Sequence, residues 1–440
     1  MSYAKSPATM NQKLRRRFYE PVVFLHAVTR AWQLNRQAVS HDFASVNTGS
    51  LEVNFKEFVN RLSQFCDIKL GGDFVTAFTV LDREDRIQYR FACNRAGKSQ
   101  LERASAFVTD LLTTLRDGEA SNNLDQVLLE KVLAHCRFEK AAKEADFGKL
   151  DLAEFAQRCK ILMKFIEECK QRKLNVLAER PAHSNMSQSS NCWSTIRHYA
   201  WRLLSYFVGI RTMVTAVRNS PRLVEHFEVV FVRSSDPDAN PLLNKSVTAD
   251  EILRRMVPDP AQAVQYSALL AEIRSIDMNK TIQDIIGEAN FRPIVHAELL
   301  VLQSLEKDEL THPSNFFNSW KYIGSSKPTC RLCHWYFEHH GGGFQVRPTH
   351  GNLYINWKPP DVLRGDGEDA LKAREKMLNT MNVHIRKEGL RTLIEKVPMG
   401  RLHDSSTGKT FSAINALAER PSGEIDMETS FGDQEDAAVD

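Results

Sequence analysis

The chain of 440 residues lacks any long apolar run. No stretch reaches the roughly 18 apolar residues of a membrane-spanning helix, so we expect no membrane partner. The apolar stretch at residues 22–28 is short and leads into Arg30, which does not fit a secretory signal and its cleavage site. Cysteine is sparse too: eight residues, scattered except for Cys330 and Cys333, do not make a disulfide scaffold. These absences favour an intracellular protein, cytoplasmic or nuclear.

The chain also has little net charge. Its 58 basic and 55 acidic residues leave a formal charge of +3, so bulk charge gives no argument for a nucleic-acid partner. The hydrophobic content of 42% is ordinary for a globular protein, and the length suggests roughly two to three domains. The last 20 residues stand out, because they contain seven acids and no base. This composition predicts a disordered tail.

Hydrophobic periodicity divides the chain into parts. Residues 54–65 have a helical pattern, whereas 74–81 and 87–93 are rich in β-branched and aromatic residues and flank a charged turn, which predicts a β-hairpin. From residue 98 the pattern is mostly helical, but the short apolar run at 227–232 fits either a helix or a buried strand. We therefore predict an N-terminal helical segment (1–53), a helix and hairpin (54–96), a helical region (97–290), a core (291–395) and a C-terminal extension with the acidic tail (396–440).

His296 and Glu298 precede Cys330 and Cys333 in an order that suits metal chemistry. One imidazole and two thiolates supply three zinc ligands, and a catalytic zinc site keeps its fourth position for a water whose pKa the metal lowers. A nearby carboxylate that is not a ligand can accept and deliver protons. This order of His-x-Glu and Cys-x-x-Cys is the signature of zinc-dependent nucleobase deaminases. We therefore predict Zn²⁺ as the cofactor, with Glu298 as the catalytic residue and the other three as ligands.

The motif residues fall at the predicted starts of two helices. The first helix is predicted over residues 294–305 and carries the His and the Glu in its first turn. The second is predicted over residues 330–340, with Thr329 as its N-cap, and carries both cysteines on one face. The stretch 316–325 between them has the pattern of a strand. Both helix tips are therefore expected to deliver ligands to one place.

Other interpretations of the same residues remain open. A Cys-x-x-Cys pair alone can be redox-active or structural. A purely structural zinc site would want a fourth protein ligand, and His334, His339 and His340 are near in sequence. His334 falls on a different side of its helix from the two cysteines.

Three further features carry a family resemblance: Tyr-Ile-Gly-Ser-Ser-Lys-Pro-Thr-Cys-Arg-Leu-Cys at 322–333, Thr-His-Gly-Asn-Leu-Tyr at 349–354, and Trp357. Over about residues 291–360 the chain thereby resembles the OTT-like deaminases, a branch of the cytidine-deaminase-like superfamily. The resemblance implies an α/β fold, a cytidine-deaminase-like three-layer α/β/α sandwich, here with a large all-α N-terminal or inserted region. It also implies one catalytic zinc, a deaminase activity, and the ligand and proton-carrier roles given above.

Three residues are candidates for the substrate pocket. Asn94 ends the second predicted strand, where an Asn of related deaminases can touch the substrate. Thr329 separates Pro328 from the first cysteine, where many deaminases place Pro directly before it, so the backbone there would approach the substrate differently. His350 matches a His-Gly of the family. It can line the pocket or serve as a turn residue whose Gly neighbour permits a positive φ.

Superfamily deaminases begin with a helix and a β-hairpin before the His-x-Glu helix. The sequence offers such elements only far upstream, within residues 54–93. We therefore predict that residues 97–290 are an insertion in a deaminase domain that starts near residue 54. The alternative is that the hairpin belongs to a separate N-terminal domain.

The expected function is that of a zinc-dependent hydrolase that removes an amino group from a cytosine- or adenine-type base. The nucleobase-containing substrate can be free, a nucleotide or nucleic acid, because base choice depends on the pocket and its loops. One alternative is a zinc-stabilised, non-catalytic binding or scaffold protein on a deaminase fold. Another is a toxin-like effector that acts on nucleic acid. The oligomeric state stays open.

Overall fold

The structure is a computed structural model that describes residues 6–35, 50–68, 71–118, 123–141, 205–243, 247–257 and 263–400. The predicted acidic tail lies outside these residues, and so do residues 142–204 of the predicted helical region. None of the helices in the described ranges combines the length and the apolarity that a membrane span requires.

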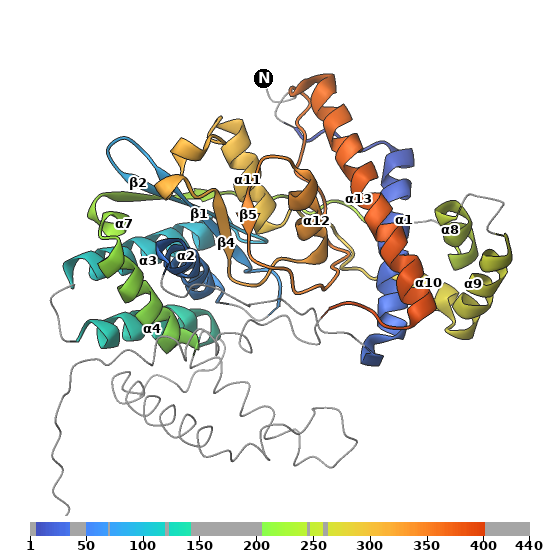
Figure 1. The fold of residues 1–440 in the computed structure, drawn as a ribbon, viewed down its shortest axis with the longest axis horizontal. Helices are drawn as coiled ribbons and strands as arrows, with labels where there is room; N and C mark the ends of the chain where they lie inside the picture. The colour runs from blue at the N-terminus through green and yellow to red at the C-terminus, as the bar shows by residue number, and fades with distance from the viewer. Residues whose placement is uncertain are drawn as a thin grey trace, which may run out of the picture.

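Five strands form one mixed sheet in the order β3-β2-β1-β4-β5 (Figure 1). The strands are β1 (Thr76–Asp82), β2 (Ile87–Cys93), β3 (Phe227–Val232), β4 (Tyr322–Ser325) and β5 (Gln345–Val346). β1 is antiparallel to both β2 and β4, whereas β3 is parallel to β2 and β5 is parallel to β4. The mixed α/β content agrees with the predicted α/β class. The hairpin β1–β2 shares its sheet with β4, the strand that lies between the two ligand segments.

Two predictions about strands need correction. The region 97–290 is not all helical, because its residues 227–232 form β3 and extend the sheet beside β2. The strand predicted over 316–325 is also shorter, since β4 begins only at Tyr322. Two 3-10 turns, Pro313–Asn315 and Phe317–Ser319, precede it, and the second contains backbone with positive φ at Asn318 (49°). A residue in this left-handed conformation cannot continue a strand.

Side chains alternate between the two faces of the sheet, as the pleat requires, and each face packs against its own apolar cluster. Phe78 and Phe91 stack at 4.9 Å between ring centroids on one face, and Ala77 and Ala92 lie on the other. The apolar cluster that contains Phe78 and Phe91 also includes side chains from several helices. These are the helical residues 205–219, α2 (Leu51–Cys66), α3 (Lys98–Asp117), α4 (Leu124–Ala141) and α7 (Arg222–Glu225). The sheet is therefore covered by apolar helices on both faces.

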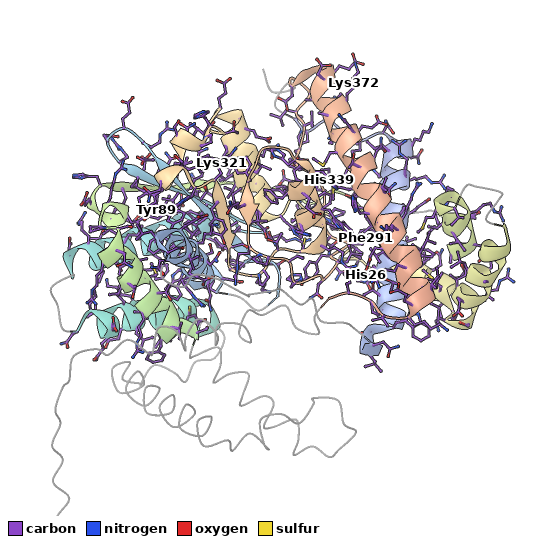
Figure 2. All side chains as sticks on the ribbon, in the orientation of Figure 1. His26, Tyr89, Phe291, Lys321, His339 and Lys372 are labelled. Carbon is purple, nitrogen blue, oxygen red and sulfur yellow. The ribbon has the colours of Figure 1, made fainter. Side chains whose placement is uncertain are left out.

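The apolar cluster that contains Ala77 is the larger one. Its helices are α1 (Gln12–Ala31), α8 (Ala249–Met256), α9 (Ala263–Ser275), α10 (Met278–Gly287), α11 (Ala297–Lys307), α12 (Arg331–His339) and α13 (Gly367–Glu395). Among them, α11 packs on strands β1, β2 and β4. Tyr89 and Phe291, both labelled in Figure 2, are fully buried members of the two different clusters. Cys330 and Cys333, two of the three metal-ligating candidates, belong to this second cluster.

The long helices α1 and α13 lie side by side (Figure 1). Asn382 of α13 donates to the carbonyl of Arg17 at 2.8 Å, and Phe18 packs on Trp357 with 5.7 Å between ring centroids. The N-terminal segment therefore shares one core with the C-terminal part of the chain and supports the region around the candidate site.

Candidate metal centre

The tips of α11 and α12 converge, and each helix begins one residue after a candidate ligand. His296 is the N-cap of α11, and Cys330 is the N-cap of α12. The prediction of Thr329 as N-cap is therefore wrong by one residue. The reason is that the Cys330 sulfur takes over the capping role and accepts a hydrogen bond from the amide of Cys333 at 3.4 Å. The cap thereby turns this sulfur toward the other ligands.

The three candidate ligands form one compact, buried group. The ligand atoms of His296, Cys330 and Cys333 lie within 4.8 Å of one another. The Nδ1 atom of His296 is 3.5 Å from the sulfur of each cysteine. Among the described residues this is the cluster of His, Cys and acidic side chains that could hold a metal ion. One nitrogen and two sulfurs are the donor set that zinc prefers.

The electrostatics of the cluster favour one thiolate. Burial raises the pKa of Cys330, but hydrogen bonds from Cys333 and the nearby imidazole of His296 outweigh it and hold this pKa well below the usual thiol value. Burial and the Cys330 thiolate raise the pKa of Cys333 well above that value. Burial lowers the pKa of His296, while the Cys330 thiolate raises it by more. The three groups thus behave as one network into which a cation would fit.

Glu298 lies in the first turn of α11 and is 3% exposed. Burial raises its pKa to about 7, while the positive charge of His296 opposes the shift. Its Oε2 atom is buried and has no hydrogen-bond partner among the described residues. An unpartnered buried carboxylate oxygen is costly, so it implies a partner such as water or substrate.

Residues 295–361 match the family model of the OTT_1508-like deaminases. The match supports the predicted resemblance of this segment to the OTT-like deaminases. No curated protein and no solved structure matches the chain. The match spans all four motif residues, and it points to a deaminase-like function in general.

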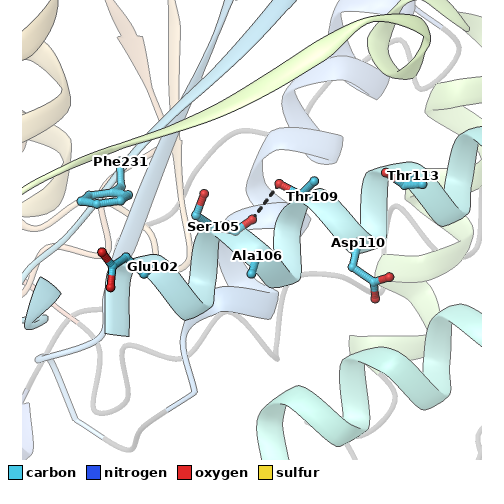
Figure 3. Close-up of a pocket in the computed structure, with 7 residues that line it drawn as sticks. All are labelled: Glu102, Ser105, Ala106, Thr109, Asp110, Thr113 and Phe231. Carbon is cyan, nitrogen blue, oxygen red and sulfur yellow. Dashed lines mark hydrogen bonds between the residues drawn. The ribbon is translucent and has the colours of Figure 1, made fainter. Parts of the chain in front are cut away.

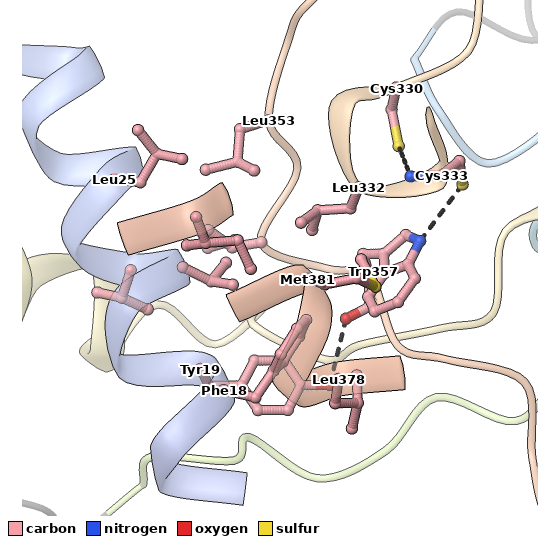
Figure 4. Close-up of a cluster of buried hydrophobic side chains, with 14 of the residues drawn as sticks. Phe18, Tyr19, Leu25, Cys330, Leu332, Cys333, Leu353, Trp357, Leu378 and Met381 are labelled. Carbon is pink, nitrogen blue, oxygen red and sulfur yellow. Dashed lines mark hydrogen bonds between the residues drawn. The ribbon is translucent and has the colours of Figure 1, made fainter. Parts of the chain in front are cut away.

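Trp357, one of the residues that carry the family resemblance, makes a contact that the sequence did not predict. Its ring is fully buried. Its indole Nε1, however, donates to the sulfur of Cys333 at 3.3 Å (Figure 4). Such a donor orients a metal ligand and tunes its charge. An indole N–H near a Cys-x-x-Cys motif has no signal in the sequence, because the two meet only in the folded chain.

Replacing Trp357 by Phe tests this role. The ring is largely kept, so the fold should persist, but the N–H toward Cys333 is lost. We expect zinc affinity to fall about tenfold to a hundredfold, as for other groups that support metal ligands. Competition with a chromophoric chelator measures the effect.

Phe18→Leu, which disturbs the same cluster without touching this hydrogen bond, should leave zinc affinity nearly unchanged. Equal losses in both variants would contradict the role.

Asn94 joins the hairpin to the tip of α11. Its Oδ1 accepts from the amide of Ala297 at 2.7 Å, and its Nδ2 donates to the carbonyl of Gly72 at 2.8 Å. Both ends of the amide thus have protein partners beside the cluster. The substrate contact of Asn94 stays a prediction, and its observed role is to hold the loop before β1 against the start of α11.

Thr329 and His350 are held together next to the cysteines. The Thr329 hydroxyl donates to the carbonyl of Arg347 at 2.7 Å, and the amide of His350 donates to the Thr329 carbonyl at 3.1 Å. His350 is buried, and Gly351 after it has a φ of +77°. The turn interpretation of this pair therefore holds. A pocket role for Thr329 and His350 stays a prediction.

Tyr354 also approaches the cluster, although sequence reasoning did not single it out. Its ring lies 6.4 Å from that of His296 and 5.7 Å from that of His350, between centroids. It is partly exposed, so a half-buried aromatic ring lies near the imidazole of the candidate ligand His296.

The histidines considered as a fourth ligand have other partners. The Nε2 of His334 is 3.6 Å from Glu338, and that of His340 is 2.7 Å from Glu306. His339 faces His384 with 2.9 Å between their Nε2 atoms. None of them is part of the metal-ligating group found among the described residues. The arrangement therefore favours three protein ligands.

Two cavities lie away from the motif residues. One of about 510 Å³ runs along α3 beside Phe231 (Figure 3). Another of about 310 Å³ is lined by Cys66, Cys93 and His135 among others. Neither includes any of the four motif residues. We therefore connect neither of them with the deaminase chemistry.

Proposed function

We propose that this chain is a zinc-dependent deaminase. It would remove an amino group hydrolytically from a cytosine- or adenine-type base on a cytidine-deaminase-like three-layer sandwich. The observation that carries the proposal is the buried His-Cys-Cys group with an unpartnered carboxylate oxygen of Glu298 in the same helix tip. The deaminase family match over the same residues supports it.

The donor set fits zinc. His296, Cys330 and Cys333 would hold the ion, and a site with three protein ligands leaves one position for water. Zinc bound there would act as a Lewis acid and lower the pKa of that water. Glu298, whose Oε2 has no hydrogen-bond partner among the described residues, would serve the reaction instead of binding the metal.

In this proposal, Glu298 transfers the proton. Burial raises the pKa of Glu298 in the metal-free chain to about 7, and a carboxyl group beside the metal that is not a ligand can both take and give a proton. It would take a proton from the attacking water as the water oxygen bonds to the amino-bearing carbon. It would then pass the proton to the amino nitrogen, so that the C–N bond breaks and ammonia leaves. Burying a carboxyl group costs free energy of folding, and carboxyl groups with strongly shifted pKa values cluster at functional sites.

The test is ammonia release. The zinc-loaded full chain is incubated with free bases, nucleosides, nucleotides and single strands, and ammonia is measured. We expect turnover for at least one class, loss of turnover after chelation, and recovery on adding zinc. A chain that holds zinc but releases no ammonia from any of them would refute the deaminase and leave the zinc-stabilised scaffold.

A specific observation keeps that scaffold as the second candidate. The cluster is closely packed: both cysteines are at most 4% exposed, and Trp357 covers one of them. A structural zinc site would tolerate such packing, whereas a catalytic zinc site needs a path by which the substrate nucleobase reaches the metal.

A further inference from the structure

A pair of histidines connects the helices α12 and α13 outside the His-Cys-Cys group. His339, labelled in Figure 2, is the last residue of α12, and His384 lies in α13. Their Nε2 atoms are 2.9 Å apart, and their ring centroids are 4.8 Å apart. His339 is exposed and His384 is half-buried. Two imidazole nitrogens on two different helices therefore face each other where solvent reaches them.

The distance between the two nitrogens suits two ligands of one metal ion. Imidazole nitrogen binds zinc at about 2.0–2.1 Å, so two such ligands are about 2.9 Å apart at a right angle and about 3.3 Å apart at the tetrahedral angle. The observed separation of 2.9 Å lies at the lower end of this interval. An ion can therefore bind both Nε2 atoms after a small adjustment of the side chains, without movement of either helix.

The hydrogen bond between the two rings is compatible with a metal ion in its place. Two neutral imidazoles at this distance share one proton, which one Nε2 donates and the other accepts. A metal ion needs a lone pair on both atoms, so the donor ring has to carry its proton on Nδ1 instead. The described residues supply no hydrogen-bond partner for either Nδ1. The change of tautomer therefore replaces one N–H···N bond near the surface and disturbs no other protein contact.

The packing of the two helices keeps the histidine pair in position. α12 packs against α13, and Met381 and Ile385, which flank His384 in α13, are fully buried. At the start of α12, the guanidinium of Arg331 lies 3.3 Å from the carboxylate of Glu388. Because both backbones are held by these contacts, little conformational entropy remains to be lost when an ion binds.

Water has to complete the coordination of such an ion. Glu388 lies four residues after His384 and therefore on the same face of α13. Its carboxylate oxygens already accept hydrogen bonds from Arg331 and Arg391. The histidine pair thus offers two protein ligands, one fewer than the group at the helix tips, and a weaker and more readily exchanged ion is expected.

We propose that His339 and His384 form a second metal site, which takes an exchangeable divalent transition-metal ion such as Zn²⁺ or Ni²⁺. Imidazole is a preferred ligand of both ions. The bound ion links the last turn of α12 to α13, whereas the first turn of α12 carries Cys330 and Cys333. Occupancy of the site therefore restrains the helix that carries both cysteine ligands. The inference does not depend on the proposed deaminase activity.

The experiment is a calorimetric titration of the dialysed full chain with Zn²⁺ and, separately, with Ni²⁺. The wild type that already holds one zinc should bind one further equivalent of either ion. The variant Cys333→Ser, which lacks the first site, should bind one equivalent of each at the histidine pair. His339→Gln and His384→Gln should each lose the further equivalent, because one imidazole alone does not chelate. Gln keeps a polar side chain of similar size at these solvent-accessible positions, so the fold should persist.

His334→Gln is the matched control for the two variants. It removes an imidazole from the same helix, but the Nε2 of His334 lies 3.6 Å from Glu338 and does not face a second histidine. The further equivalent should therefore remain. Excess zinc should raise the melting temperature of the zinc-loaded wild type and of His334→Gln, and it should not raise that of His339→Gln, because only a bound ion stabilises the folded chain.

Two results would overturn the inference. In the first, the zinc-loaded wild type binds no further equivalent of either ion. In the second, the further equivalent survives in both His339→Gln and His384→Gln, which places the ion elsewhere on the chain. Either result leaves the proposed deaminase standing, since that function is tested by ammonia release and by the zinc at the helix tips. Thermal unfolding without added metal checks that each variant is folded.

Discussion

Glu298→Gln is expected to keep zinc and to lower turnover by about a thousandfold or more, near the upper range of general acid–base catalysis. Gln has nearly the shape of Glu, so the tip of α11 should form as before. It cannot take a proton from water and return it to the leaving amino group. The measurement is ammonia release at saturating substrate together with zinc content per chain. A variant that remains active would refute the assignment of Glu298 as the proton carrier.

Stability measurements provide the control for this variant. Burial raises the pKa of Glu298 from 4.5 to about 7, so the folded metal-free chain favours the protonated form. As pH rises through this interval, the unfolded chain releases the proton more readily, and the contribution of Glu298 to stability falls. Gln does not titrate, so the metal-free variant should lack this part of the pH dependence. If the variant unfolds more readily at pH 7, lost turnover would reflect a damaged fold instead of lost chemistry.

The convergence of the two helix tips could be predicted from the sequence because local signals determine it. Apolar spacing and a capping position gave both helix starts to within a few residues, and the order of His, Glu and two Cys gave the ligand set. The N-cap was assigned to Thr329 instead of Cys330, since a thiol is not a usual cap. The polar contact from the indole of Trp357 depends on long-range packing and had no local signal.

The sheet was predictable only in part for a related reason. The hairpin β1–β2 was visible because residues of high β-propensity flank a charged turn. β3 was left undecided, because six apolar residues fit a buried helix as well as a strand. Its pairing with β2 joins residues more than 130 positions apart, as in the contact of Gln88 with Glu228. The left-handed conformation of Asn318, which precedes the late start of β4, could not be predicted, because neither neighbour of Asn318 is Gly or Pro.

The hydrogen bonds of Asn94 could not be predicted from the sequence. Its place at the end of the second strand pointed to the pocket, and the structure does put it next to the motif residues. Both ends of its amide bond to the protein, since Oδ1 accepts from the amide of Ala297 and Nδ2 donates to the carbonyl of Gly72. A sequence cannot show these two bonds, since they depend on how the loop at 71–73 and the start of α11 lie in the folded chain.

Cys333→Ser is expected to abolish zinc binding. The folded full chain, purified under reducing conditions, should contain about one zinc, whereas the variant should contain nearly none, because a serine hydroxyl does not ionise to a thiolate-like ligand near neutral pH. Elemental analysis per chain measures this. The helical signal should largely persist, because α11 and α12 remain anchored by the apolar cluster that contains Leu299 and Leu332.

Cys136→Ser is the matched control for Cys333→Ser. It replaces a thiol outside the metal-ligating group, so it should retain zinc. Since zinc binds the folded chain, chelation should lower the melting temperature of the wild type and of Cys136→Ser, and it should have no effect on Cys333→Ser. Zinc retained by Cys333→Ser would place the ion elsewhere. A folded wild type without zinc that takes up none on reconstitution would remove the deaminase mechanism, because a carboxyl group alone does not activate water enough near neutral pH.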